Sequence, residues 1–176
     1  FSHGTGPPRP LSDKGKRLSA DWSRLSPIRK TWPSGMVIAA KFGRVINVSS
    51  AVAVQPNNLG ADYSGAKSAL NNFTVSLAGS LKGVGGTANT VSPGIVMVDG
   101  LLRFGRIKYG NPDATIEEIT ERLVADKVFG LPPAGRLGIP DDLAIVICTL
   151  ASPRSGFVTG ANYRVDGGQV RRGLVG

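Results

Sequence analysis

Cysteine and histidine are almost absent from this chain. Its 176 residues include one Cys, Cys148, and one His, His3. A single Cys excludes an intramolecular disulfide and fits a reducing, cytoplasmic setting. Because one His and one Cys are too few for a His/Cys metal site, no metal is expected.

Long apolar runs are lacking as well. No segment approaches the ~20 apolar residues of a membrane-spanning helix, so an association with a membrane is not expected. The first residues do not combine a charged region with an apolar stretch, and no signal peptide is expected there. What is present is a hydrophobic content of 41% in a chain long enough for one domain with its own core.

The net charge of +9 is concentrated near the start of the chain. Residues 1–44 contain nine Lys or Arg and two acids, and five prolines in residues 1–34 interrupt any long helix. We therefore separate a basic segment, residues 1–34, expected to be solvated and poorly ordered, from a folded unit, residues 35–176. The alternative for the basic segment is an electrostatic arm for phosphate or nucleic acid. It lacks the interleaved aromatics that stack on bases, so a nucleic-acid partner is not expected.

From residue 43 onward, predicted strands alternate with predicted helices. Hydrophobic patterning predicts strands over residues 43–49, 87–91 and 161–165, and helices over residues 62–81, 113–127 and 140–150. Residues 95–111 are expected to form an irregular loop over a site. Cys148 lies among apolar residues and is expected in the core. Helical connections of this length imply parallel strands and right-handed crossovers, so the predicted fold class is α/β.

Ser50, Tyr63 and Lys67 form a pattern with a chemical meaning. Tyr63 and Lys67 are four residues apart in a predicted helix, so their side chains share a face. A phenol is a poor proton acceptor near neutral pH, and a nearby ammonium favours its phenolate form. The pair thereby becomes a usable proton donor and acceptor. Ser50 closes the preceding strand, where its hydroxyl can hold a carbonyl or alcohol oxygen, and a cofactor must supply the hydride.

The order of several motifs resembles that of the short-chain dehydrogenases/reductases. Asn47-Val48-Ser49-Ser50 precedes Tyr63-Ser64-Gly65-Ala66-Lys67, with Ser50 and Tyr63 thirteen positions apart. The later segments, also in the family's order, are Asn89-Thr90-Val91-Ser92-Pro93-Gly94, Gly135-Arg136-Leu137-Gly138-Ile139-Pro140-Asp141-Asp142, Ala151-Ser152-Pro153, Val158-Thr159-Gly160 and Val165-Asp166-Gly167-Gly168. A lone Tyr-x-x-x-Lys occurs by chance in many helices, so the resemblance depends on this composite.

The resemblance implies an oxidoreductase that moves a hydride between NAD or NADP and a small carbonyl or alcohol substrate. It implies Tyr63 as the catalytic acid/base and Ser50 as the residue that positions the substrate oxygen. Lys67 is implied to favour the phenolate and to hold the nicotinamide ribose. The implied fold is a partial Rossmann-like, doubly wound parallel sheet, with strands equivalent to the family's fifth, sixth and seventh and flanking helices.

The resemblance also assigns the regions around these residues. The backbone of Pro93, Gly94 and Ile95 is implied to line the nicotinamide, and residues 96–130 to form the variable substrate region. A homo-oligomer is implied, because the helix that carries the catalytic Tyr commonly packs between subunits in this family.

The chain departs from the family where the dinucleotide should bind. The family's glycine-rich turn lies far upstream of the catalytic Tyr, and 62 residues before Tyr63 leave no room for it. The run Gly83-Val84-Gly85-Gly86-Thr87-Ala88 fits G-x-G-x-x-A, but it follows a helix and enters a strand, the reverse of a phosphate-binding turn. The family's tetrad asparagine has no counterpart in residues 1–46, and Val98 stands where a cofactor-binding Thr is common. The cofactor-binding half is thus expected to be missing. The alternative to an enzyme is an impaired remnant that acts through oligomerisation.

Overall fold

Three parallel strands form the centre of the molecule. The computed structural model describes residue 37 and residues 40–56 and 60–170, so the basic segment 1–34 lies outside the described residues. The strands β1 (Gly43–Val48), β2 (Gly86–Pro93) and β3 (Asn162–Val165) pair in the order β1-β2-β3. Both pairings are parallel. The predicted strands and the α/β class are confirmed.

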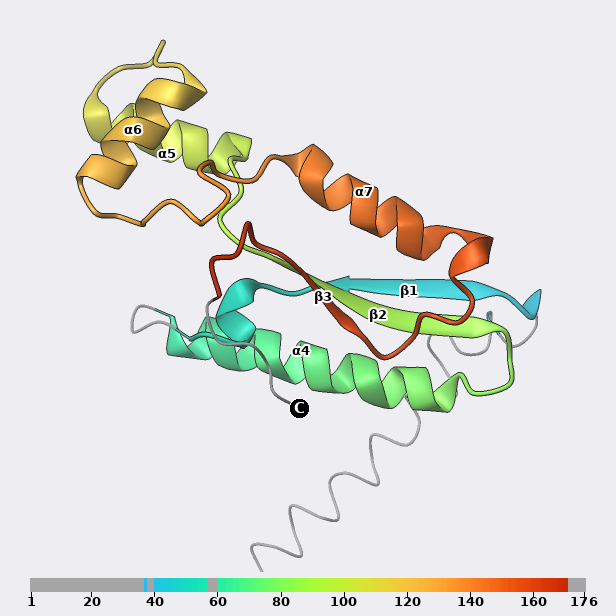
Figure 1. Cartoon of the computed structure of the whole chain (residues 1–176). Helices are drawn as coiled ribbons and strands as arrows, with labels where there is room; N and C mark the ends of the chain where they lie inside the picture. Colours follow the sequence, from blue (N-terminus) through green and yellow to red (C-terminus); the bar gives the residue numbers. More distant parts are fainter. Residues whose placement is uncertain (1–36, 38–39, 57–59, 171–176) are drawn as a thin grey trace, which may run out of the picture.

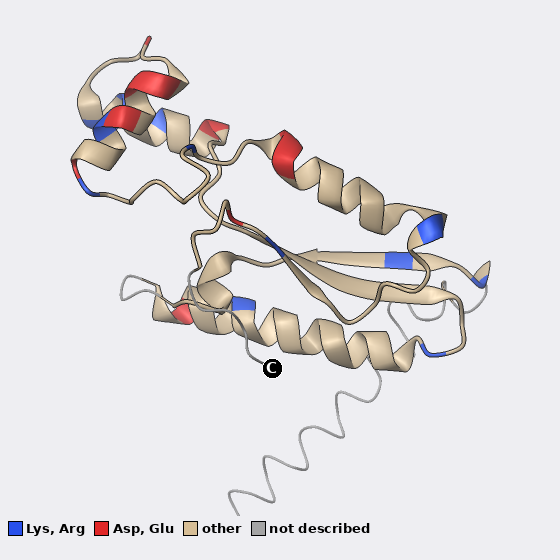
Figure 2. Cartoon of the chain, in the orientation of Figure 1, with Lys and Arg blue, Asp and Glu red and all other residues tan. Residues whose placement is uncertain are grey.

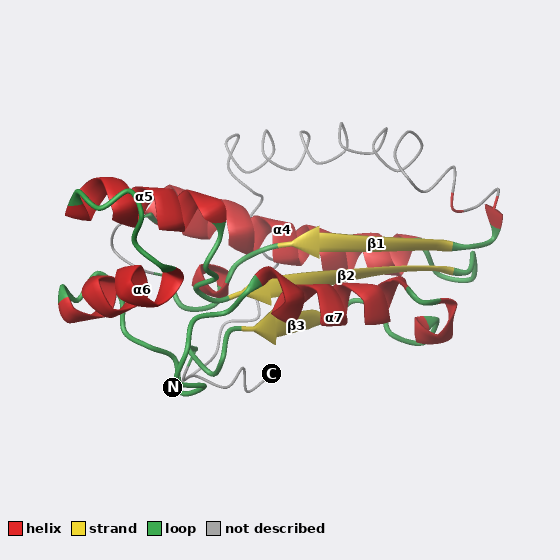
Figure 3. Ribbon diagram, turned by 90° about the horizontal axis from the view of Figure 1, so that it is seen from above, coloured by secondary structure: helices red, strands yellow, loops and turns green. Residues whose placement is uncertain are grey.

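Helices cover both faces of this sheet, as in a doubly wound fold. Helix α4 (Ala61–Ser80) lies on one face and helix α7 (Pro140–Ala151) on the other (Figure 1). Seen from above, β1 and β3 are the two edges of the described sheet and β2 lies between them (Figure 3). Two short 3-10 helices, η1 (Ala51–Ala53) and η2 (Pro153–Ser155), complete the layers. The model therefore confirms the predicted partial Rossmann-like sheet.

Buried polar side chains of β2 hold the start of β3 and the segment that precedes it. The Asn89 side chain donates from Nδ2 to the Val158 carbonyl at 2.8 Å, and its Oδ1 accepts the Ala161 N–H at 3.1 Å. Ser92 Oγ donates to Asn162 Oδ1 at 2.7 Å. Because the buried side chains of Asn89 and Ser92 are hydrogen-bonded, β2 tolerates these two polar groups, and they hold the start of β3 beside it.

Helix α4 packs on the sheet through a small apolar core and through hydrogen bonds, one of which is donated by a side chain of β1. The core groups Val37, Leu81 and Ala88, and Asn47 Nδ2 donates to Thr74 Oγ1 at 2.8 Å. After Ser80 the chain turns through Gly83 and Gly85, both at positive φ, and enters β2 at Gly86. The G-x-G-x-x-A run thus lies between a helix end and a strand start, as expected, and is not a phosphate-binding turn.

Arg44 ties three segments together at the amino-terminal end of β1. Its guanidinium donates to the carbonyls of Ser152 at 3.2 Å, Pro153 at 3.1 Å and Gly85 at 3.2 Å. These carbonyls belong to the end of α7 and to the turn before β2. One charged side chain therefore holds helix α7 and that turn against the sheet.

A helix pair with its own core stands beyond the carboxyl ends of the strands. Helices α5 (Asp99–Tyr109) and α6 (Ile116–Ala125) pack around Ile119 and Leu123 (Figure 1). The prediction of an irregular loop over residues 95–111 is therefore wrong. A Cβ at Gly105 would collide with Ile119, so a glycine that weakens the helical pattern is what permits this close packing.

Helix α7 exposes apolar side chains on its outer side. Ile145 is 69% exposed and Cys148 is exposed, so the prediction of a buried Cys148 is wrong. No charged residue occurs after Asp142 in this helix, and its acidic residues lie at its start (Figure 2). A helix of this composition is typical of one covered on both sides, whereas the described residues cover only the sheet side.

Candidate active site

Tyr63 and Lys67 lie together on helix α4, at the carboxyl end of β1. The ammonium of Lys67 is 5.6 Å from the centroid of the Tyr63 ring. Lys67 Nζ also donates to the carbonyl oxygen of Val48, the last residue of β1, at 2.9 Å. That bond fixes the ammonium beside the phenol. Tyr63 is 52% exposed, so its hydroxyl is open to a reactant from outside.

Two consecutive serines end the strand next to this pair. Ser49 is buried, and its hydroxyl donates to the Lys67 carbonyl at 3.1 Å. Together with the bond from Lys67 Nζ to Val48, it links β1 and α4 by two hydrogen bonds in opposite directions. The Ser50 hydroxyl accepts the Val52 N–H at 3.4 Å and so caps η1. Ser50, Tyr63 and Lys67 thus lie at the carboxyl end of β1 or on the helix that follows it.

The segment after β2, which the sequence assigned to the nicotinamide, is held by backbone hydrogen bonds. The Gly94 N–H donates to the Val165 carbonyl at 3.0 Å. The Gly138 N–H donates to the Ile95 carbonyl at 3.0 Å, and the Met97 N–H donates to the Gly138 carbonyl at 2.8 Å. Pro93, Gly94 and Ile95 are therefore fixed by β3 and by the loop that precedes α7.

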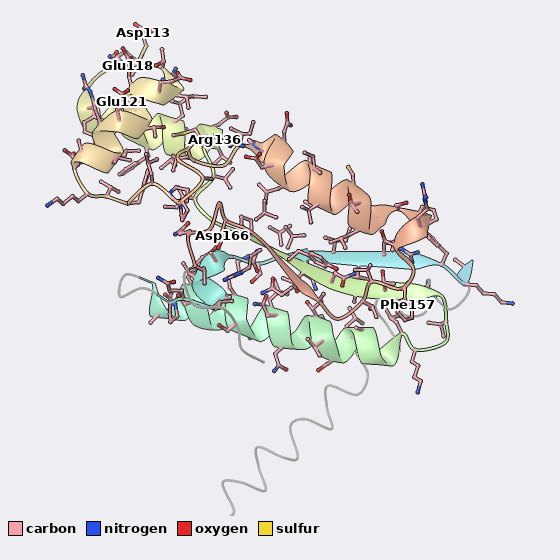
Figure 4. The ribbon with its side chains drawn as sticks, in the orientation of Figure 1. Asp113, Glu118, Glu121, Arg136, Phe157 and Asp166 are labelled. Atoms are coloured by element: carbon pink, nitrogen blue, oxygen red, sulfur yellow. The ribbon has the colours of Figure 1, made fainter. Side chains whose placement is uncertain are left out.

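Arg136 and Asp142 close that preceding loop. Arg136 donates to both carboxylate oxygens of Asp142, at 2.7 and 2.8 Å, and lies beside the start of α7 (Figure 4). Asp142 also accepts the Ile139 N–H at 2.9 Å, which caps the helix. The Arg136 guanidinium and this N–H lower the pKa of Asp142 to about 2. The sequence predicted a helix start here but not the hydrogen bonds of Gly138 to Ile95 and Met97.

Gln169 is a further contact that sequence reasoning missed. Its side-chain Oε1 accepts the Ile95 N–H at 3.1 Å. The residue directly follows Asp166-Gly167-Gly168, and only that glycine turn marked the region in the sequence. A side-chain-to-backbone bond over 74 positions leaves no periodic signal, so only the fold reveals it.

The arrangement fits the ribose and nicotinamide part of a dinucleotide. An ammonium has three N–H donors, and one of those of Lys67 is used by Val48, so two remain for hydroxyl oxygens. In the part of the chain that the structure describes, no G-x-G-x-x-G turn joins a strand to a helix start, so no phosphate cradle of that type is seen there. Among the same residues, no three His, Cys, Asp or Glu side chains gather for a metal, and no helix is long and apolar enough to cross a membrane.

Comparisons with known proteins find similarity to reductases. A family model described as enoyl-(acyl carrier protein) reductase matches residues 22–169. The acetoacetyl-CoA reductase of Cupriavidus necator is 37% identical over 128 residues, which are 72% of this chain and 45% of that protein. A 3-oxoacyl-[acyl-carrier-protein] reductase of Synechocystis sp. is 32% identical over 138 residues, 78% of this chain and 48% of that protein. The chain spans about half the length of the curated relatives it matches.

A solved structure supports the fold. A short-chain type dehydrogenase/reductase from Mycobacterium ulcerans superposes with a TM-score of 0.62 and is 23% identical. The match covers 79% of this chain and 46% of that one. At this identity the likeness concerns the arrangement of strands and helices alone.

Proposed function

The chain belongs to the short-chain dehydrogenase/reductase family, and we propose that it carries the proton-transfer site of an oxidoreductase acting on a carbonyl or alcohol. NAD or NADP supplies or accepts the hydride when it is bound. The observation that carries the proposal is the placement of Lys67, whose ammonium is bonded to the end of β1 and lies 5.6 Å from the Tyr63 ring. The proposed partner is a small carbonyl or alcohol, the substrate class that membership of this family implies.

Each of the three side chains has one task in this proposal. In the reducing direction, the Tyr63 hydroxyl donates its proton to the carbonyl oxygen, which becomes the alcohol. In this proposal the Lys67 ammonium, which lies over the Tyr63 ring, balances the negative charge that remains after the proton has left. The Ser50 hydroxyl donates a hydrogen bond to the same oxygen and orients it. The backbone of Pro93, Gly94 and Ile95 shapes the place of the nicotinamide.

The relatives indicate which substrate to assay first. Two of them carry the names acetoacetyl-CoA reductase and 3-oxoacyl-[acyl-carrier-protein] reductase. We therefore assign a 3-oxoacyl thioester as the first substrate class to test, with acetoacetyl-CoA as the assay compound. We place the reaction in the cytoplasm, since the chain has a single Cys and no disulfide can form within it. A homo-oligomer remains part of the proposal, because α4 exposes Phe73 and Val75.

A second candidate is a chain that keeps the site but does not bind NAD(P), and that acts through oligomerisation. It is favoured by the described residues, among which no glycine-rich turn joins a strand to a helix start. Fluorescence titration with NADPH and NADH separates the two candidates. Micromolar binding that is lost in Lys67→Ala supports the enzyme, and no binding at millimolar cofactor supports the second candidate.

Replacing Tyr63 by Phe tests the proton-transfer role. The variant removes one hydroxyl from a half-exposed side chain, so folding should not change. We expect the rate of acetoacetyl-CoA reduction to fall at least ~100-fold, the usual contribution of a positioned acid. NADPH oxidation and the thermal unfolding midpoint are the measurements, and Tyr163→Phe is the matched control. Retained turnover in Tyr63→Phe would refute the assigned role.

A further inference from the structure

We propose that Gln169 is a positioning residue that holds the backbone of Ile95 through its side-chain carbonyl. The Ile95 N–H donates to Gln169 Oε1 at 3.1 Å. The link of this contact to cofactor binding rests on the proposed function, which places Pro93, Gly94 and Ile95 beside the nicotinamide. The contact itself does not depend on that function.

Gln169 is itself held in a rigid turn. Its N–H donates to the Asp166 carbonyl at 3.0 Å. The Asp166 carboxylate accepts the N–H of Gly168 at 3.0 Å and that of Val170 at 3.1 Å, so the turn is bonded on both sides of Gln169. Asp166 lies at the end of β3 (Figure 4). The Gln169 carbonyl is therefore directed at Ile95 before any ligand arrives.

Close packing around Gly94 brings residues 93–95 against the turn of residues 166–169. A Cβ on Gly94 would lie 2.8 Å from Gln169 Oε1 and 2.8 Å from Asp166 Cα. The glycine thus allows the turn to approach to hydrogen-bonding distance of the next peptide. The close packing at Gly94 and the hydrogen bond from Ile95 to Gln169 are therefore parts of one contact between residues 93–95 and residues 166–169.

The position of Ile95 depends on two anchors of different kinds. Its carbonyl accepts the Gly138 N–H at 3.0 Å, which is backbone and independent of side chains. Its N–H has only the Gln169 carbonyl as an acceptor among the described residues. The next residue, Val96, makes no hydrogen bond through its own N–H or carbonyl with any described residue. Loss of the Gln169 acceptor would therefore release one side of this segment, and no neighbouring bond would replace it.

The rest of the fold does not need this bond. The β2–β3 ladder and the bond from Gly94 to Val165 are both backbone. Removing the acceptor should therefore loosen the Ile95 N–H, whereas the Ile95 carbonyl and the Met97 N–H stay bonded to Gly138 and the sheet stays intact. This local effect separates a positioning residue from one that only stabilises the fold.

Three variants of the full chain test the proposal. Gln169→Leu keeps the approximate shape and removes the acceptor, whereas Gln169→Glu keeps an acceptor oxygen. Asn72→Leu is the matched control, since it removes an exposed amide from α4. Amide hydrogen exchange of Ile95, with the Val91 amide of β2 as internal reference, is followed by NMR. NADPH affinity is measured in parallel by fluorescence titration.

We expect Ile95 exchange to accelerate about tenfold in Gln169→Leu, with Val91 unchanged, and to stay at the native rate in Gln169→Glu and Asn72→Leu. The Kd for NADPH should rise about fivefold in Gln169→Leu alone, the equivalent of one neutral hydrogen bond. Unchanged Ile95 exchange in Gln169→Leu, or equal acceleration in Gln169→Glu, would overturn the positioning role. A native chain that binds no NADPH would overturn the proposed function, and the exchange rates would still decide the contact.

Discussion

At the scale of single residues, Gly94 is the tightest point beside the candidate site. Gly94→Ala places a methyl group against backbone atoms of Asp166 and against the Gln169 side chain, and backbone cannot move aside cheaply. We expect a loss of about 1–3 kcal/mol in the free energy of unfolding, typical of an overpacked position. Urea denaturation followed by circular dichroism measures it.

Gly79→Ala is the control for this substitution. Gly79 lies within α4, and a Cβ there would have no atom within 4 Å. Because alanine favours helix, that variant should be more stable than the native chain by up to ~1 kcal/mol. If both variants shifted stability in the same direction, the close approach at Gly94 would not be the cause.

The residues that the sequence revealed are those whose chemistry depends on local spacing. Tyr63 and Lys67 share a helix face because they are four positions apart, and the structure brings their side chains together. Gln169 depends on a contact between distant segments and shows no such spacing. Val48 was read as a core strand residue, yet its carbonyl is what fixes the Lys67 ammonium. Backbone acceptors of this kind are invisible in a sequence because every residue has one.

At the scale of elements, the ion pair between Arg136 and Asp142 connects the loop before α7 to the first turn of that helix. The pKa of Asp142 is about 2, below its ordinary value of 3.8, because Arg136 and the Ile139 N–H stabilise the carboxylate. A carboxyl whose pKa is lowered by folding stabilises the folded state at pH values above its unfolded-state pKa. That stabilisation is lost as the pH falls toward its folded-state pKa. The contribution of Asp142 should therefore be complete near neutral pH and disappear between about pH 4 and pH 2.

Asp142→Asn tests this dependence. We expect the variant to be less stable than the native chain at pH 7, with the difference shrinking as the pH falls toward 2. Thermal unfolding midpoints across that range give the measurement. Asp141→Asn, the exposed neighbour in the first turn of α7, is the matched control. A stability gap that stays constant with pH would show that the Asp142 carboxylate does not act through its charge.

Elements with strong patterns could be predicted, and elements built on small residues could not. The β-branched run of β1 and the acidic residues in the first turn of α6 predicted a strand and a helix at the places where the structure has them, and the capping pair of Thr115 and Glu118 sets the observed start of α6. Helix α5 was missed because Gly100 and Gly105 weaken its apolar pattern, although Gly105 is what lets it pack on α6. Helical propensity is a weak guide where tertiary packing selects a glycine.

At the scale of the whole molecule, the described fold is covered unevenly. The β3 side is fastened by side chains of β2, and the carboxyl end of the sheet is covered by the α5–α6 pair. At the β1 edge, Val48 is 48% exposed, and β1 has a strand neighbour on one side only among the described residues. Ile145 on α7 is 69% exposed. Helix α7 and strand β1 are in contact. An edge strand and a helix with exposed apolar side chains favour association with another chain.

Charge placed on this surface tests the oligomer expected from the family. Ile145→Lys adds a charge to a side chain that already faces solvent, so the unfolding midpoint should not fall. We expect it to lower the concentration-dependent mass of the chain, because burying a lysine at an interface is costly. Light scattering during gel filtration over a range of concentrations measures that mass.

Phe157→Lys is the comparison, since Phe157 is a fully exposed apolar residue at the other end of α7, just after η2 (Figure 4). If the chain associates through the exposed apolar side chains of α7, Ile145→Lys should reduce the mass and Phe157→Lys should not. An equal reduction by both would indicate general apolar association, and no reduction by Ile145→Lys would place any oligomer contact elsewhere, with the exposed face of α4 next to be tested.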